Sequence, residues 1–144
     1  MNNRVGKVIS LFISTLGEKK RTFKDTITTD SNGVVDDKFY AKDIERSILI
    51  TTIESYELAK SHNIDIEIGA LGENILIDYN PYSLKVGTQL IFGDVILEIS
   101  QNCTLCKSLT KVDSKLPKLL KNDRGIFAKV IKGGVIKKGD SIYI

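Results

Sequence analysis

Hydrophobic and polar residues alternate along much of the chain, which is the pattern of half-buried strands. Residues 5–14 and 22–29 are rich in β-branched residues with partial alternation. In residues 95–101, Leu97 and Ile99 alternate with Glu98 and Ser100, so one face is buried and the other is wet. Further strands are expected at 47–50, 74–79, 88–92, 126–131 and 141–144. The pattern therefore predicts a mainly β fold.

Helical periodicity is confined to two stretches. Thr51-Thr-Ile-Glu54 is a capping-box pattern and predicts a short helix over 55–62. A second apolar stripe with a period of 3.6 residues begins at Leu105 and reaches Leu120. Pro117 interrupts it, because proline has no N–H to donate and its ring clashes with the preceding turn. We expect two or three short helices, one with Pro117 in its first turn.

Glycine pairs and a short internal echo indicate how the strands connect. Gly93-Asp94 suits a type II′ hairpin turn, and Gly133-Gly134 predicts another hairpin turn. Residues 85–92 resemble residues 137–144, since each has a lysine, a glycine turn and then an alternating strand. This internal similarity favours a barrel-like layout in which the same glycine turn leads into two strands of one sheet.

Length and composition indicate one globular domain over residues 1–144. The chain has 144 residues, of which 42% are hydrophobic and 27% charged. No apolar run approaches the roughly 20 residues of a membrane helix, and the first apolar stretch is too short for a secretory signal. We expect a cytoplasmic protein with no membrane partner.

Positive charge is concentrated near the C-terminus. Residues 107–138 contain ten Lys or Arg and two Asp or Glu, although the whole chain has a net charge of only +3. Such a segment is either a solvated lysine face or a surface for a phosphate-bearing ligand or nucleic acid. Residues 107–125 contain no aromatic residue, so a nucleic-acid partner is not favoured.

The only two cysteines, Cys103 and Cys106, lie where a strand pattern gives way to a helix pattern. A helix start lowers the pKa of a thiol, and the thiolate is the nucleophile and the soft-metal ligand. Cys106 falls at the edge of the leucine stripe, so we expect it to be partly exposed. His62, the only histidine, suits a helix C-cap, and with too few ligands no zinc site is expected.

A dithiol-disulfide oxidoreductase is an alternative, because strand, Cys-x-x-Cys and helix follow the thioredoxin-like order. That fold is built from βαβ units, whereas this chain predicts hairpins. A second alternative is a basic, non-enzymatic binding module, for which the lysine-rich segment is the motivation.

The order of several motifs resembles the MOSC domain, named for the C-terminal part of molybdenum cofactor sulfurases. Residues 33–38 and Arg46 resemble its early glycine, Gly-Asp-Lys and arginine positions, with Asp36 where glycine is usual and Phe39 where histidine is common. An arginine often found shortly before the family's cysteine is absent. The later matching segments are Gly72–Ile75, 84–93, 97–101, Cys106, 124–130 and 133–140.

This resemblance implies a stand-alone MOSC-type β-barrel that binds the molybdenum cofactor (molybdopterin) or transfers sulfur within its pathway. The family is also associated with pyridoxal phosphate binding. Cys106 best matches the family's cysteine, as catalytic thiol and molybdenum ligand, with Cys103 as the alternative. The chain lacks an aminotransferase-like sulfurase domain, so a molybdoenzyme or a sulfur donor protein is the implied partner. The implied cofactor-binding residues are Lys38, Arg46, Asn74 and Arg124.

Overall fold

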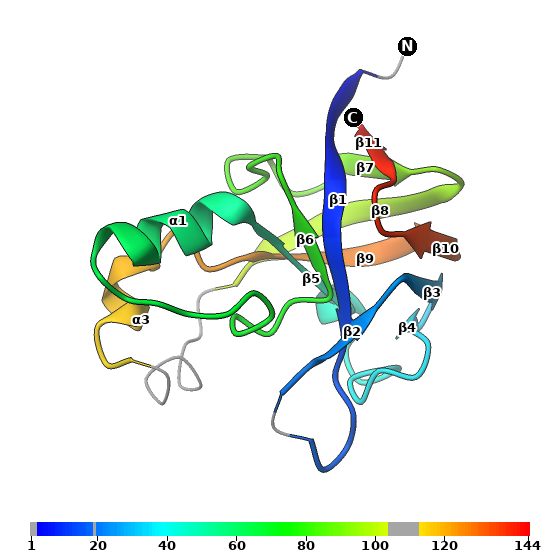
Figure 1. The fold of residues 1–144 in the computed structure, drawn as a ribbon. Coiled ribbons are helices and arrows are strands. Elements are labelled where there is room, and N and C mark those ends of the chain that lie inside the picture. Colours follow the sequence, from blue (N-terminus) through cyan, green and yellow to red (C-terminus); the bar gives the residue numbers. More distant parts are fainter. Residues whose placement is uncertain (1–2, 19, 104–112) are drawn as a thin grey trace.

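The computed structural model describes residues 3–18, 20–103 and 113–144 and is mainly β, as expected (Figure 1). Its first six strands are β1 (Arg4–Ile13), β2 (Thr22–Lys24), β3 (Thr26–Asp30), β4 (Gly33–Val34), β5 (Ile48–Thr52) and β6 (Ile75–Ile77). The others are β7 (Gln89–Phe92), β8 (Val95–Asn102), β9 (Ile126–Lys132), β10 (Gly134–Lys137) and β11 (Ser141–Tyr143).

Seven of these strands close into a barrel. The sheet order is β11-β7-β8-β9-β5-β6-β1-β2, and β1 also pairs with β11, which closes the ring. The ten-residue β1 is long enough to pair with β11 near its start and with β6 and β2 near its end. All neighbours are antiparallel except β5 and β6, which are parallel because α1 lies between them in the chain. The barrel predicted from the sequence is confirmed.

A second sheet, ordered β10-β3-β4, lies beside the barrel. The hairpin predicted at Gly133-Gly134 is wrong, because β10 pairs with β3 over four residue pairs and not with β9. The backbone of Gly133 runs so close to Thr29 that a Cβ would lie 2.5 Å from the Thr29 carbonyl oxygen. The expected strand over 22–29 is likewise divided at Asp25 into β2 and β3, which belong to different sheets.

Helix α1 (Ile53–Ser61) begins two residues before the expected range of 55–62, and the expected capping box does not form. Its N-cap is Thr52, which makes no side-chain capping bond. Thr51 belongs to β5, and its hydroxyl donates instead to the buried carboxylate of Glu73 at 2.7 Å. His62 is the C-cap, as predicted.

The remaining helical elements are short. Helix α3 (Leu116–Leu119) contains Pro117 in its first turn, as predicted, and η1 (Ile44–Arg46) is a 3-10 turn before β5. The start of the predicted leucine-striped helix, including Leu105, lies outside the described residues. No described helix combines the length and the apolar character that a membrane crossing requires.

Two apolar clusters stabilise these elements. The barrel interior is filled by aliphatic and aromatic side chains from nearly every strand, including the fully buried Ile50, Leu97 and Phe92. A smaller cluster packs α1 against α3 and the segment between α1 and β6, through residues such as Ala59, Leu71 and Leu120. In Figure 1 this helical layer covers one side of the barrel.

The two echoing segments are neighbours in the barrel. Strand β7 pairs antiparallel with β11, so that Phe92 faces Ile142 and Ile91 faces Tyr143. Both segments turn at a glycine with similar positive φ, 94° at Gly87 and 90° at Gly139. The Gly93 turn is also confirmed, because Phe92 pairs with Val95 across two residues and Gly93 has φ 65°.

Candidate functional site

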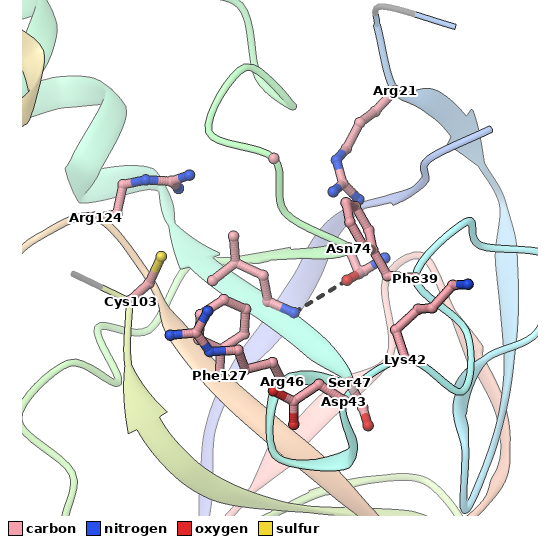
Figure 2. A pocket seen from close by; sticks show the side chains of 12 residues that line it. Arg21, Phe39, Lys42, Asp43, Arg46, Ser47, Asn74, Cys103, Arg124 and Phe127 are labelled. Carbon is pink, nitrogen blue, oxygen red and sulfur yellow. Dashed lines mark hydrogen bonds between the residues drawn. The ribbon is translucent and has the colours of Figure 1, made fainter. Parts of the chain in front are cut away.

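A cavity of about 420 Å³ opens at the end of the barrel where β1 ends and β6 and β9 begin (Figure 2). Segments far apart in the sequence contribute to it, from Arg21, just before β2, to Phe127, near the start of β9. This size lies within the usual range for small-molecule sites. Its lining consists of Arg21, Phe39, Lys42, Asp43, Arg46, Ser47, Leu49, Gly72, Asn74, Cys103, Arg124 and Phe127.

The lining is strongly cationic. Arg21, Lys42, Arg46 and Arg124 all border the cavity, whereas Asp43 is the one acidic residue among the lining residues. Guanidinium groups recognise carboxylate and phosphate through paired hydrogen bonds. The excess of cationic side chains in the lining therefore favours anionic over cationic ligands.

Two aromatic rings complete the walls. The guanidinium of Arg46 lies 5.3 Å from the ring centroid of Phe127. The Phe39 ring has two cationic neighbours, the Arg21 guanidinium at 5.9 Å and the Lys38 ammonium at 5.0 Å from its centroid. Figure 2 places Phe39 and Phe127 on different walls of the cavity. Rings in these positions offer apolar surface to a planar ligand.

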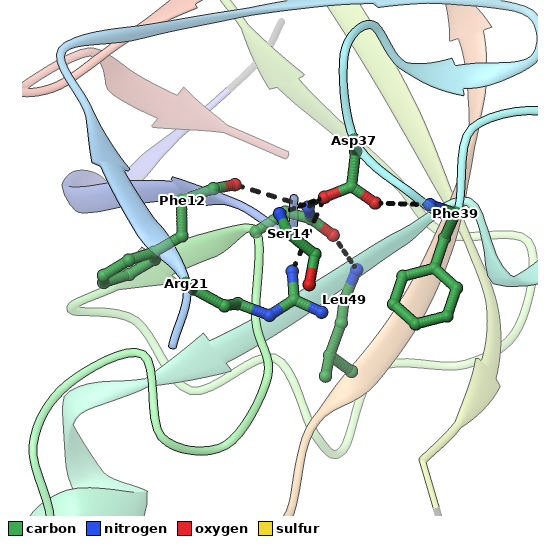
Figure 3. A network of polar contacts seen from close by, with 7 residues as sticks. Phe12, Ser14, Arg21, Asp37, Phe39 and Leu49 are labelled. Carbon is green, nitrogen blue, oxygen red and sulfur yellow. Dashed lines mark hydrogen bonds and ion pairs between the residues drawn. The ribbon is translucent and has the colours of Figure 1, made fainter. Parts of the chain in front are cut away.

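Asn74, which borders the cavity, and Asp37 join three segments of the chain. Figure 3 shows Asp37 together with Ser14, Phe39 and Leu49. The Asn74 side chain accepts from the backbone N–H of Leu49 at 3.1 Å and donates to Asp37 at 3.2 Å. Asp37 also accepts from the backbone N–H groups of Ser14 at 2.6 Å and Phe39 at 3.0 Å. These bonds hold the end of β1, the 37–39 segment and the start of β5 together.

Arg21 enters the cavity from the residue before β2. Its guanidinium forms an ion pair with Asp37, with Nη1 and Oδ1 3.7 Å apart. Burial lowers the pKa of Arg21, and the charge of Arg124 lowers it further, while Asp37 and Glu73 act in the opposite direction. Its Nη1 is buried and has no hydrogen-bond partner among the described residues.

Arg124 is held by a loop that Tyr56 organises from α1. Arg124 is buried and its Nη1 donates to the Leu71 carbonyl, whereas its Nε has no hydrogen-bond partner among the described residues. The Tyr56 hydroxyl accepts from the backbone N–H of Gly69 at 3.0 Å and donates to the carboxylate of Glu73. Burial raises the pKa of Tyr56, and the Glu73 carboxylate raises it further.

Arg46 lies at the end of η1, which is attached to the outside of the barrel. The Glu45 carboxylate is 3.4 Å from the ammonium of Lys129, and the Glu45 carbonyl accepts from the Ser100 hydroxyl. Lys129 also contacts Glu98 at 3.5 Å. The charge of Glu45 raises the pKa of Lys129 most, and the charge of Glu98 raises it further. These contacts fix the turn that directs Arg46 over Phe127.

The structure brings four of the six residues named from the sequence to this cavity: Cys103, Arg46, Asn74 and Arg124. Cys103 is buried at the end of β8, and Figure 2 shows its sulfur on the cavity side. Lys38 is not part of the lining, and Cys106 lies outside the described residues.

Sequence reasoning missed Arg21, Lys42 and Phe127. Arg21 stands at the beginning of an expected strand, and no spacing in the sequence connects it with Arg124, some hundred residues later. Phe127 belongs to segment 124–130, which resembles the MOSC domain and also contains Arg124. That shared segment was the one feature of the sequence that connected Phe127 with the site. Lys42 gives no signal, because isolated lysines are common on surfaces.

Comparisons with known proteins agree with this architecture. The model of the MOSC domain family matches residues 18–143. The crystal structure of the YuaD protein from Bacillus subtilis superposes with a TM-score of 0.84 at 22% identity, covering 99% of this chain and 97% of that one. YiiM from Geobacillus stearothermophilus gives a TM-score of 0.71 at 15% identity, over 100% of this chain and 75% of that one. YiiM from Escherichia coli gives 0.71 at 16% identity, over 96% and 69%. A search of curated protein sequences finds no match.

Proposed function

The chain belongs to the MOSC domain family, and from this premise we propose that its cationic cavity binds a molybdopterin cofactor and relays sulfur through a cysteine at its edge. The family is associated with molybdenum cofactor sulfurases. The observation that carries the proposal is the meeting of a thiol, cationic side chains and two aromatic rings in one cavity.

The donor set fits such a ligand. A pterin is planar and apolar on its faces, which suits Phe39 and Phe127. The phosphate of the cofactor suits Arg46 and Arg124, whose guanidinium groups supply directed donors. The buried Nε of Arg124 has no hydrogen-bond partner among the described residues, so it is able to donate to a ligand. Lys38 would contribute only long-range charge, since it does not line the cavity.

The thiol supplies the sulfur chemistry. A thiolate is a soft ligand, and when bound the cofactor would supply a thiophilic metal centre to a sulfur atom beside it. In a relay, a thiolate at Cys103 or Cys106 attacks the terminal sulfur of a donor persulfide. The donor leaves as a thiolate, and the cysteine becomes a persulfide. Arg124 lies on the same side of the cavity as Cys103 (Figure 2).

The test is to purify the protein from a host that makes the cofactor and to assay bound molybdenum, pterin and cyanide-labile sulfur. Wild-type protein should carry at least one of them. Cys103→Ser and Cys106→Ser variants identify the thiol, and mass spectrometry locates the persulfide. Loss of labile sulfur in one variant, with pterin retained, separates the relay from binding.

The matched control is Arg4→Gln, because Arg4 is exposed and lies outside the cavity lining. This substitution removes the same charge as Arg46→Gln. Arg46→Gln should reduce pterin retention by about tenfold or more, and the control should not. Absence of molybdenum, pterin and labile sulfur from the wild type, even with the cofactor supplied under reducing conditions, would rule out the proposal.

A further inference from the structure

Gly72 separates two guanidinium groups in the cavity. A methyl group at Gly72 would lie 3.8 Å from Nη2 of Arg124 and 3.8 Å from both Nε and Nη2 of Arg21. The two cations therefore face one point from different sides, and the lack of a side chain at Gly72 leaves that point open. Figure 2 shows Arg21 and Arg124 on opposite sides of the cavity.

Two like charges at such close range are stable only if something offsets their repulsion. The charge of Arg124 is one of the influences that lower the pKa of Arg21. Asp37 and Glu73 are the nearby carboxylates. Asp37 accepts from backbone and amide donors. Glu73 accepts from Tyr56 and Thr51 through Oε2, and its buried Oε1 has no hydrogen-bond partner among the described residues.

Both guanidinium groups retain unused donors. Arg124 is only 6% exposed, and its Nε has no hydrogen-bond partner within the described ranges. Arg21 pairs with Asp37 at 3.7 Å but makes no hydrogen bond to a described residue, and its Nη1 is buried. Buried donors are normally satisfied. Each guanidinium, however, has one buried nitrogen without a described partner, Nη1 of Arg21 and Nε of Arg124, and turns other nitrogens toward the open point at Gly72.

We propose that Arg21, Gly72 and Arg124 form a subsite for a free tetrahedral oxyanion of the phosphate and sulfate class. The Nε and Nη2 atoms of Arg21 lie equally far from the open point, so they present the paired edge that binds two oxygens of one anion. Arg124 approaches from the other side. With hydrogen bonds of about 2.8 Å at both ends, one such anion spans the gap between the two groups.

The subsite goes beyond the proposed function, because it requires neither a pterin nor a thiol. The same chemistry also suits the phosphate ester of a larger ligand. Inorganic phosphate, a simple phosphate monoester and a phosphate-free pterin therefore form the three arms of the test. The proposal predicts that inorganic phosphate alone binds.

The measurement is calorimetric titration of the full chain with each ligand at constant ionic strength. Arg21→Gln should weaken phosphate binding by about tenfold or more, whereas Arg4→Gln, an exposed arginine outside the cavity, should change it less than about twofold. Equal affinities for the two variants, or no phosphate binding by the wild type, would overturn the subsite. Binding of the monoester but not of inorganic phosphate would also overturn it.

A readout on the wild type avoids dependence on any variant that fails to fold. In an NMR titration with inorganic phosphate, the Nε–H signals of Arg21 and Arg124 and the amide of Gly72 should shift together. Shifts only at Arg46 would place the anion elsewhere and refute the assignment. Phosphate binding without pterin binding would support the subsite and contradict the proposed function. Pterin binding without phosphate binding would support the proposed function and contradict the subsite.

Discussion

At the scale of single residues, side chains from distant segments replace the local contacts that the sequence suggested. The start of α1 is an example, because its expected capping box does not form. The backbone N–H of Thr52 donates instead to the hydroxyl of Tyr82 at 3.0 Å, and Ser55 contacts the same hydroxyl at 2.7 Å. Tyr82 therefore fixes the beginning of the helix from a loop thirty residues away.

This arrangement has a consequence for stability at high pH. Burial raises the pKa of Tyr82 to about 12, although hydrogen bonds from Ser55 and Thr52 partly oppose it. The unfolded chain loses this proton near pH 10, so between pH 10 and 12 the folded state binds more protons. The contribution is complete below pH 10 and is lost as the pH rises to 12.

We predict that the free energy of unfolding falls over this window, and that Tyr82→Phe makes the fall shallower by roughly 1 to 3 kcal/mol. Urea unfolding at pH 9, 10, 11 and 12 measures it. Tyr56, whose pKa is also raised, should account for part of the fall that remains in the variant. An identical pH dependence in wild type and Tyr82→Phe would contradict the prediction.

At the scale of elements, the pairing of β10 with β3 depends on a glycine whose conformation is ordinary but whose surroundings are crowded. A Cβ at Gly133 would lie 2.5 Å from the carbonyl oxygen of Thr29 and 2.9 Å from the Cα of Asp30. Both are backbone atoms, so they cannot move without disturbing β3. Thr29 also bonds Gly134 through its hydroxyl, at 3.1 and 3.2 Å.

Gly133→Ala should therefore destabilise the protein by about 1 to 3 kcal/mol through overpacking. Gly17→Ala is the control, because Gly17 has φ 85° and nothing within 4 Å of its Cβ position, so only backbone strain applies there. Chemical denaturation of both variants measures the difference. A loss below about 1 kcal/mol at Gly133 would contradict the close β10–β3 contact.

At the scale of the whole molecule, closure of the barrel positions the cavity. The ring is completed by β11, which pairs with β1 on one side and β7 on the other. Ile142 of β11 is completely buried in the barrel core. The Phe12 carbonyl of β1 accepts from Asn74, a residue of the cavity lining, and the N–H of Ser14, just after β1, donates to Asp37. The strand that β11 closes against therefore also supports the cavity.

Ile142→Ala should lower the free energy of unfolding by about 2 to 5 kcal/mol, since it removes buried methylene groups and leaves a cavity. The matched variant is Ile131→Ala, because Ile131 is 49% exposed on β9 and should lose far less. Denaturant unfolding provides both values. A loss at Ile142 no greater than that at Ile131 would be inconsistent with a closed barrel.

Local patterns in the sequence determined most strands, because alternation of apolar and polar residues follows directly from the two-residue period of a strand. They also determined the Gly93 turn, the C-cap at His62 and the position of Pro117 in α3. The ordered motifs determined the family. Of the candidate site residues, Cys103, Arg46, Asn74 and Arg124 were available from the sequence.

Only the tertiary structure decided which segments meet. The partner of β10, the split between β2 and β3, and the convergence of Arg21 with Arg124 at Gly72 all depend on contacts between residues far apart in the chain. Hydrophobic periodicity specifies which face of an element is buried but not which element buries it. The physical reason is that pairing and burial are settled by closing the barrel as a whole.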